Sequence, residues 1–191
     1  MLTTIDGQML AAAFPTTYRL AATTAGADAA ARLTPRQWTE RFAVHVQGEQ
    51  VLIPARLHFT SEKAALPEGS AAWKLARALQ TRSNDGFQRQ RALRDCLNKP
   101  EPWFAPFLVA LIGEYIIEIL EDVQAAMTPE LEQILASFIA HNRPFWDTTK
   151  RRVTSYWNQY YRHTRRGETR RTYDDYVGFK LVNRMDAIAH C

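Results

Sequence analysis

The sequence predicts a mostly α protein: a single-domain irregular helical bundle, or a stack of HEAT-like helical hairpins, with a small β-hairpin before the helices. Three observations predict it. Apolar residues recur at helical spacing from about residue 70 onward. Caps and prolines separate these segments by short connections, which favour antiparallel neighbouring helices. A chain of 191 residues that is 46% hydrophobic can bury one sizeable core.

The first 33 residues are rich in alanine and threonine and show no sustained apolar period. We therefore expect an irregular N-terminal arm over residues 1–33, wrapped on a single helical domain of residues 34–191. The sequence TPRQ at residues 34–37 combines a threonine cap, a proline at the first helical position and a glutamine three residues after the cap. This capping pattern predicts a short helix.

Alternating apolar residues predict a β-hairpin over about residues 42–59. Phe42, Val44 and Val46 precede the sequence QGEQ, and further alternating apolar residues follow it. Pro54 lacks a backbone N–H, which places the second strand at a sheet edge.

Helix start and stop signals divide the rest of the chain. Ser70 and Asp85 are expected N-caps of two helices, and further helices are expected over about residues 103–126, 129–141, 144–162 and 174–188. The segment NDGFQRQRALRDCL resembles the second helix of a HEAT-type repeat. No second copy follows at a fixed interval, so a regular solenoid and an irregular bundle both stay open.

Three segments together carry a resemblance: DGF-R at residues 85–89, PWFAPF and GEYIIEIL within residues 102–120, and SYWNQYYR at residues 155–162. On these segments the chain resembles a set of uncharacterised bacterial helical proteins, over roughly residues 50–182. The resemblance implies a bacterial, helical, single-domain protein. It implies no activity and no catalytic residue, and Ser83 and Asn84 stand where that set has a pair of histidines.

The composition of the chain indicates its cellular compartment and the kinds of partner it binds. The formal net charge of +4 is only mildly basic, so global charge is weak support for a nucleic-acid or membrane partner. The two cysteines lack the spacing of a disulfide framework, and Cys96 stands among apolar residues as a buried small side chain. With no secretory signal, this predicts a cytoplasmic protein. The apolar run at residues 103–113 is about half a membrane span, so no membrane partner is expected.

Sequence motifs for catalysis are missing. The five histidines show no HExxH spacing, and the chain has no G-x-S-x-G elbow, P-loop or G-x-G-x-x-G fingerprint. We therefore expect no metal and no cofactor, and a non-catalytic protein is favoured over an enzyme.

An acidic stripe stands out in the segment 101–135, which holds seven acids and no lysine or arginine. Glu114, Glu118 and Glu121 fall on one face of the expected helix, which is otherwise apolar nearly all round. Buried carboxylates need partners, so the stripe predicts ion pairs with arginines from a later helix. The alternatives are an acid/base or metal site and an exposed acidic face.

The basic counterpart lies in residues 143–184, which hold eleven lysines and arginines against four acids. Helical spacing puts Phe145, Val153, Trp157 and Tyr160 on an apolar face, where aromatic residues are usually core. The sequence HTRRGETRR that follows is expected to be an exposed loop. The candidate residues for binding a polyanion or a protein partner are Arg151, Arg152, Tyr156, Tyr161, Arg162, Arg165, Arg166, Arg170 and Arg171.

Two functional classes follow. The favoured one is a non-catalytic protein-interaction protein, an adaptor or regulatory subunit that binds a protein partner or forms a homo-oligomer. The alternative is a nucleic-acid-binding protein that uses the basic segment 150–171, with phosphates bound by arginines and bases stacked on Tyr156 or Tyr161.

Overall fold

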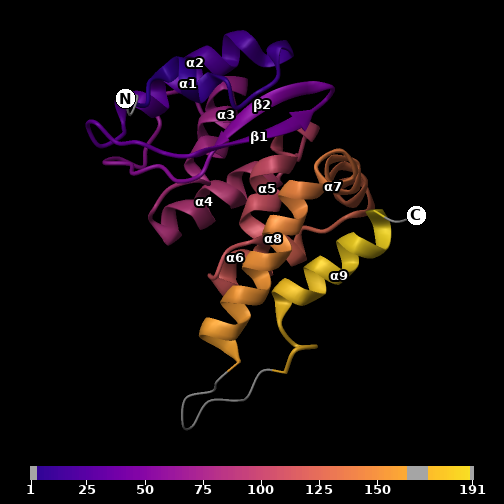
Figure 1. Cartoon of the computed structure of the whole chain (residues 1–191). Helices are drawn as coiled ribbons and strands as arrows, with labels where there is room; N and C mark the ends of the chain where they lie inside the picture. Colours follow the sequence, from indigo (N-terminus) through magenta and orange to yellow (C-terminus); the bar gives the residue numbers. More distant parts are fainter. Residues whose placement is uncertain (1–3, 163–171, 190–191) are drawn as a thin grey trace. The chain divides into compact units, whose positions relative to one another are not determined.

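The computed structural model describes residues 4–162 and 172–189 (Figure 1). Over these residues the protein is mostly α-helical with one two-stranded antiparallel sheet, which confirms the expected fold class. The chain divides into two compact units, the first ending at Phe107 and the second beginning at Leu108, and each is described by itself. A single domain over residues 34–191 and a HEAT-like arrangement stay predictions.

The first unit begins with two packed helices, where an irregular arm was expected. Helix α1 covers Gly7–Ala11 and α2 covers Arg19–Ala31, with the 3-10 turn η1 (Thr16–Tyr18) before α2. The Asp6 carboxylate caps α1 by accepting the Met9 N–H at 2.7 Å. The expectation was wrong because small residues give no apolar period but let two helix backbones approach closely.

Gly26→Ala is expected to lower the free energy of unfolding by roughly 1–3 kcal/mol. A Cβ at Gly26 would lie 2.2 Å from the Gly7 carbonyl oxygen and 3.0 Å from the Ala11 backbone nitrogen, so α1 and α2 would have to separate. Thr23→Ala is the matched control, because the exposed Thr23 hydroxyl bonds only to Arg19 within α2. Urea denaturation should separate the two variants, and equal midpoints would contradict the close approach.

Residues 34–37 do not form the expected helix. Arg36 has a φ of 59°, a left-handed conformation that a helix does not accept. The Gln37 side chain instead binds the backbone of His58, accepting its N–H at 2.8 Å and donating to its carbonyl at 3.1 Å. A contact distant in sequence therefore replaces the local cap.

The expected β-hairpin is confirmed, with shorter strands than its predicted bounds. Strand β1 covers Arg41–Val46 and β2 covers Glu49–Pro54. The connecting Gln47 and Gly48 have φ values of 52° and 84°, the left-handed pair typical of a two-residue hairpin turn. Beyond Pro54 the chain forms only isolated bridges, from Leu57 and Phe59.

The next two helices follow their predicted caps. Helix α3 covers Ala71–Gln80, and the Ser70 hydroxyl accepts the Trp73 N–H at 3.2 Å. Helix α4 covers Gly86–Leu97, and the Asp85 carboxylate accepts the Gln88 N–H at 3.0 Å. The 3-10 turn η2 (Pro102–Phe104) then leads into α5 (Ala105–Ile112).

The second unit contains α6 (Ile117–Ala125), α7 (Pro129–His141), α8 (Arg143–Tyr156), the π-helical turn η3 (Trp157–Tyr161) and α9 (Val177–Ala189). Figure 1 shows α9 beside α8, and α9 also contacts α6 and α7. The single long helix expected over residues 103–126 is wrong, because the chain leaves α5 at Gly113 and adopts an extended conformation at Ile116 before α6. Glycine inside a helix costs about 1 kcal/mol, which favours a break there.

Candidate functional site

Five tyrosines gather in the second unit where α8 ends. We call Tyr115, Tyr156, Tyr160, Tyr161 and Tyr176 the tyrosine cluster. Ring centroids lie 5.7 Å apart for Tyr115 and Tyr156, 5.5 Å for Tyr115 and Tyr160, and 5.0 Å for Tyr161 and Tyr176. The cluster thus joins the connection between α5 and α6 to the end of α8 and the start of α9.

The π-helical turn brings these rings together. The Arg162 N–H donates to the Trp157 carbonyl at 2.9 Å, a bond that spans five residues instead of four. The wider turn places the Tyr156 and Tyr160 rings 6.1 Å apart while Trp157 stays buried. Single π-helical turns are rare in proteins, and those that occur are often found at functional sites. This turn therefore makes the end of α8 a candidate site.

The tyrosines that are exposed in the structure differ from those that the helical period predicted to face solvent. Tyr160 is 55% exposed and Tyr115 is 42% exposed, so the expectation that Tyr160 belongs to the core was wrong. An ideal α-helical period fails here because the π turn rotates the residues after Trp157. Tyr161 is half-buried, and its hydroxyl donates to the Tyr115 carbonyl. Tyr156 is also half-buried, which leaves Tyr115 and Tyr160 as the most open rings.

The buried member of the cluster, Tyr176, belongs to a packed aromatic layer. The Trp157 ring lies 5.3 Å from the ring of the buried Tyr176 and 5.8 Å from that of Phe179. Tyr173, which is 52% exposed, stacks on Phe179 at 3.9 Å with an interplanar angle of 21°. The open Tyr160 ring is joined to this layer through Tyr161, whose ring centroid lies 6.5 Å from that of Tyr160 and 5.0 Å from that of Tyr176.

The basic candidates divide into three groups. Arg151 and Arg162 are exposed, and each donates to a neighbour within its own helical segment, Thr148 and Asn158 respectively. Arg152 is half-buried. The other four candidates, Arg165, Arg166, Arg170 and Arg171, lie outside the described residues.

The acidic stripe is not one face of one helix. Glu114 is 2% exposed and lies in the connection between α5 and α6, whereas Glu118 and Glu121 are exposed on α6. The prediction of a buried stripe is therefore wrong for Glu118 and Glu121, because the break after Gly113 rotates α6 relative to α5. The Arg152 Cδ lies 3.5 Å from the position that a Cβ at Gly113 would occupy. The Arg152 side chain therefore lies against the residue that directly precedes Glu114.

An ion pair connects the acidic segment 101–135 to the basic segment 143–184 elsewhere in the second unit. Arg184 on α9 pairs with Glu132 on α7. Lys150 on α8 lies 3.4 Å from both Asp147 and Asp186, which lie outside the acidic segment. Within the described ranges, the acidic segment thus meets the basic segment at α9.

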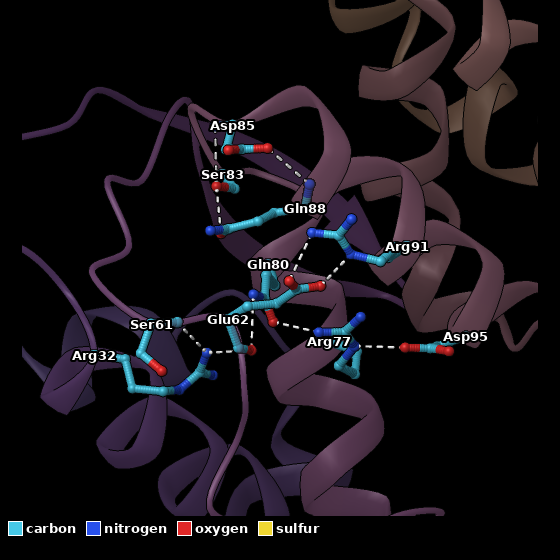
Figure 2. A network of polar contacts seen from close by, with 10 residues as sticks. All are labelled: Arg32, Ser61, Glu62, Arg77, Gln80, Ser83, Asp85, Gln88, Arg91 and Asp95. Carbon is cyan, nitrogen blue, oxygen red and sulfur yellow. Dashed lines mark hydrogen bonds and ion pairs between the residues drawn. The ribbon is translucent and has the colours of Figure 1, made fainter.

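The first unit contains a polar network that sequence reasoning missed (Figure 2). Arg32 donates to the carbonyls of Ser61 and Glu62 at 3.2 Å each. The Glu62 carboxylate accepts two hydrogen bonds from Arg91, at 2.5 and 2.6 Å. These bonds hold the pKa of Glu62 below its usual value, so the stability they contribute is present at neutral pH and is lost as pH falls through that lowered pKa.

The same network lines a cleft of about 340 Å³ with Trp73 and Asp95 on its wall. Arg77 donates to Asp95 at 2.7 Å and to Gln80 at 2.6 Å, and its guanidinium lies 5.9 Å from the Trp73 ring centre. Because Glu62 and Asp95 are both engaged by arginines, the network ties the segment before α3 to the two helices. No sequence period could have revealed it, since its members come from separate elements.

Cys96 is buried, and burial raises the pKa of its thiol well above the usual value. In a Cys191→Ser variant, where Cys96 is the only thiol, we expect the native protein to react with a disulfide reagent on the order of a hundredfold more slowly than the denatured protein. Absorbance of the released thiolate measures both rates. Equal rates would show that Cys96 is accessible.

Within residues 4–162 and 172–189, no group of three or more His, Cys, Asp or Glu side chains is arranged to hold a metal ion. Over the same ranges, no helix has the length and hydropathy needed to cross a membrane. A scan against protein-family models and searches of the curated proteins and the solved structures found no match. The resemblance to bacterial helical proteins stays a prediction.

Proposed function

We propose that this is a non-catalytic interaction protein of bacterial type, an adaptor or regulatory subunit, and that the tyrosine cluster holds its protein partner. One observation carries the proposal: Tyr115 and Tyr160 are open to solvent, yet their rings pack against each other and are joined through the Tyr161 ring to the buried Tyr176. Tyrosine offers a large contact area with little rotamer entropy to lose, and it is enriched where interfaces gain most of their energy.

The charge around the cluster suggests the chemistry of the partner. Arg162, which directly follows Tyr161, and Arg151, which lies earlier on α8, are exposed, and residues 143–184 hold more basic than acidic side chains. An acidic protein surface fits best. A second copy of this chain is a special case, since Glu118 and Glu121 would give it exposed carboxylates. The proposal places the protein in the cytoplasm, as its two cysteines without disulfide spacing support.

The experiment compares a Tyr115→Ala, Tyr160→Ala double variant with a Phe87→Ala control, because Phe87 is 74% exposed and lies in the first unit, outside the residues of the cluster. Tagged proteins are used as bait in bacterial lysate, and retained proteins are quantified by mass spectrometry. Light scattering measures self-association. We expect the wild-type protein and the control to retain the same amount of one acidic partner protein. The double variant should retain at least tenfold less of it. Equal retention by all three proteins would overturn the proposal.

A second candidate function is binding of single-stranded nucleic acid. Its specific support is that the open Tyr160 ring and the exposed Arg162 lie two residues apart where α8 ends, because bases stack on aromatic rings while arginines neutralise phosphates. The four arginines of residues 165–171 would add further phosphate contacts.

For that function, changing Arg165, Arg166, Arg170 and Arg171 together to glutamine should weaken binding equally for all base sequences. Each lost phosphate contact should flatten the slope of log K against log salt by about 0.7 on single strands. Fluorescence anisotropy with labelled oligonucleotides over a range of salt measures the slope. Wild-type protein that binds no oligonucleotide at low salt would exclude this function and leave the protein partner.

A further inference from the structure

The hydrogen bonds of β2 reveal which way the backbone of β1 faces. Leu52 is paired in register with Ala43, yet its N–H donates to the Ala12 carbonyl at 2.9 Å, away from β1. In an antiparallel ladder, hydrogen-bonded and non-hydrogen-bonded pairs alternate, and both members of a non-hydrogen-bonded pair point outward. The Ala43 N–H and C=O therefore point away from β2.

A bond beyond the strands supports this assignment. The Ala55 N–H donates to the Glu40 carbonyl at 2.8 Å, so that pair is hydrogen-bonded. Continuing the alternation makes Arg41 with Pro54, and Ala43 with Leu52, non-hydrogen-bonded pairs.

The two edges of the hairpin differ. On the β2 edge, Leu52 is bonded to Ala12, and Pro54 has no N–H to offer. On the β1 edge, Ala43 is exposed, and neither its N–H nor its C=O has a partner within residues 4–162 and 172–189. An edge with open backbone groups is a template for another strand, so β1 is the edge that can accept one.

The side chains on the outer face define what such a strand must carry. Arg41, Ala43 and His45 are exposed and lie on the same face, because side chains alternate along β1. This row therefore presents the Arg41 guanidinium and the His45 imidazole on either side of a small apolar side chain. Beside Arg41 is a cleft of about 410 Å³ that is lined partly by Leu52 and by Trp38, which is 51% exposed.

We propose that the β1 edge binds an extended acidic segment of a partner protein, which adds to the hairpin as a third, antiparallel strand. An apolar residue of this segment lies opposite Ala43 and exchanges both backbone hydrogen bonds with it, while acidic residues two positions before and after it face Arg41 and His45. A second copy of β1 fits poorly, because antiparallel pairing centred on Ala43 would set Arg41 of each copy opposite His45 of the other and so give Arg41 no carboxylate.

This surface is separate from the tyrosine cluster in sequence and in residues, and neither proposal depends on the other. Loss of partner retention in the Tyr115→Ala, Tyr160→Ala variant leaves the β1 edge unchanged. Conversely, substitutions at Ala43 leave the tyrosines unchanged.

The test uses the full chain and a fluorescein-labelled peptide with the core sequence Thr-Glu-Thr-Leu-Thr-Glu-Thr. Fluorescence anisotropy measures the affinity, and amide exchange by NMR follows the Ala43 N–H. We expect saturable binding, slower exchange at Ala43, and at least a tenfold weaker affinity for Ala43→Pro. Proline there removes only an outward N–H, and the hairpin already holds Pro54 at the matching kind of position. The control Ala43→Thr keeps the N–H and should bind like wild type.

Three further arms make the outcome decisive. A peptide with an N-methylated central leucine lacks the N–H that would donate to the Ala43 carbonyl, and it should bind wild-type protein at least tenfold more weakly. This comparison tests the backbone pairing even if Ala43→Pro fails to fold. A peptide with lysine in place of glutamate, and wild-type peptide with an Arg41→Glu variant, should both bind more weakly. No binding of the first peptide by the wild-type chain, or equal binding of the N-methylated peptide, would overturn the proposal.

Discussion

Glu114→Ala is expected to lower the free energy of unfolding by about 3 kcal/mol, the lower end for a buried pair, because Glu114 is a carboxylate with 2% exposure and its removal leaves a half-buried partner unpaired. We expect this partner to be Arg152, whose side chain passes over the adjacent Gly113. Chemical denaturation of the single variants and of the double-mutant cycle with Arg152→Met measures the coupling. The double variant Glu114→Leu, Arg152→Met should cost less than either charge-stranding single variant.

The matched controls for this prediction are Glu118→Ala and Glu121→Ala. Both side chains are exposed on α6, so each change should stay within about 0.5 kcal/mol. Glu118→Leu and Glu118→Ala should therefore differ little in stability. A loss for Glu114→Ala no larger than for Glu118→Ala would show that the Glu114 carboxylate needs no partner.

Trp146→Ala is expected to cost about 3–5 kcal/mol. Trp146 is fully buried on α8, and its indole N–H donates to the Asp186 carboxylate on α9 at 2.7 Å. The substitution removes a large apolar volume and leaves that carboxylate with one donor fewer. Thermal and urea denaturation measure the loss.

Trp146→Phe separates the two contributions, since it keeps most of the apolar volume and deletes the donor. We expect a loss of about 1–3 kcal/mol for it, between wild type and the alanine variant. Phe87→Ala is the control for removal of an aromatic ring, because Phe87 is 74% exposed and should tolerate the change. A Trp146→Ala protein as stable as Phe87→Ala would contradict the packing of α8 on α9.

Local signals predicted much of the fold. Ser70 and Asp85 cap α3 and α4 as side-chain acceptors, as expected, because a cap needs only a hydrogen bond within its own first turn. The hairpin was predictable for the same reason, since its alternation and its turn lie within a few residues. Cys96 was correctly placed in the core from its apolar neighbours alone.

The candidate sites were less predictable. Arg151, Arg152, Tyr156, Tyr161 and Arg162 were selected from the sequence, but Tyr115 and Tyr160 were not, although they are the most open rings of the tyrosine cluster. Tyr115 joins the cluster from a segment far away in the chain. The β1 edge was missed because its direction depends on the bond from Leu52 to Ala12, which no pattern within β1 records.

The sequence by itself determined the helical class, the hairpin, the caps and the separation of acidic from basic segments, because these depend on composition and on contacts within one or two turns. Only the tertiary structure decided that the alanine-rich start forms two packed helices and that Arg36 adopts a left-handed conformation where a helix was expected. It also decided that Glu114 is buried while Glu118 is exposed. The physical reason is the same in each case. Packing between distant segments contributes several kcal/mol, whereas local propensities contribute about 1 kcal/mol or less per residue, so packing prevails where the two disagree.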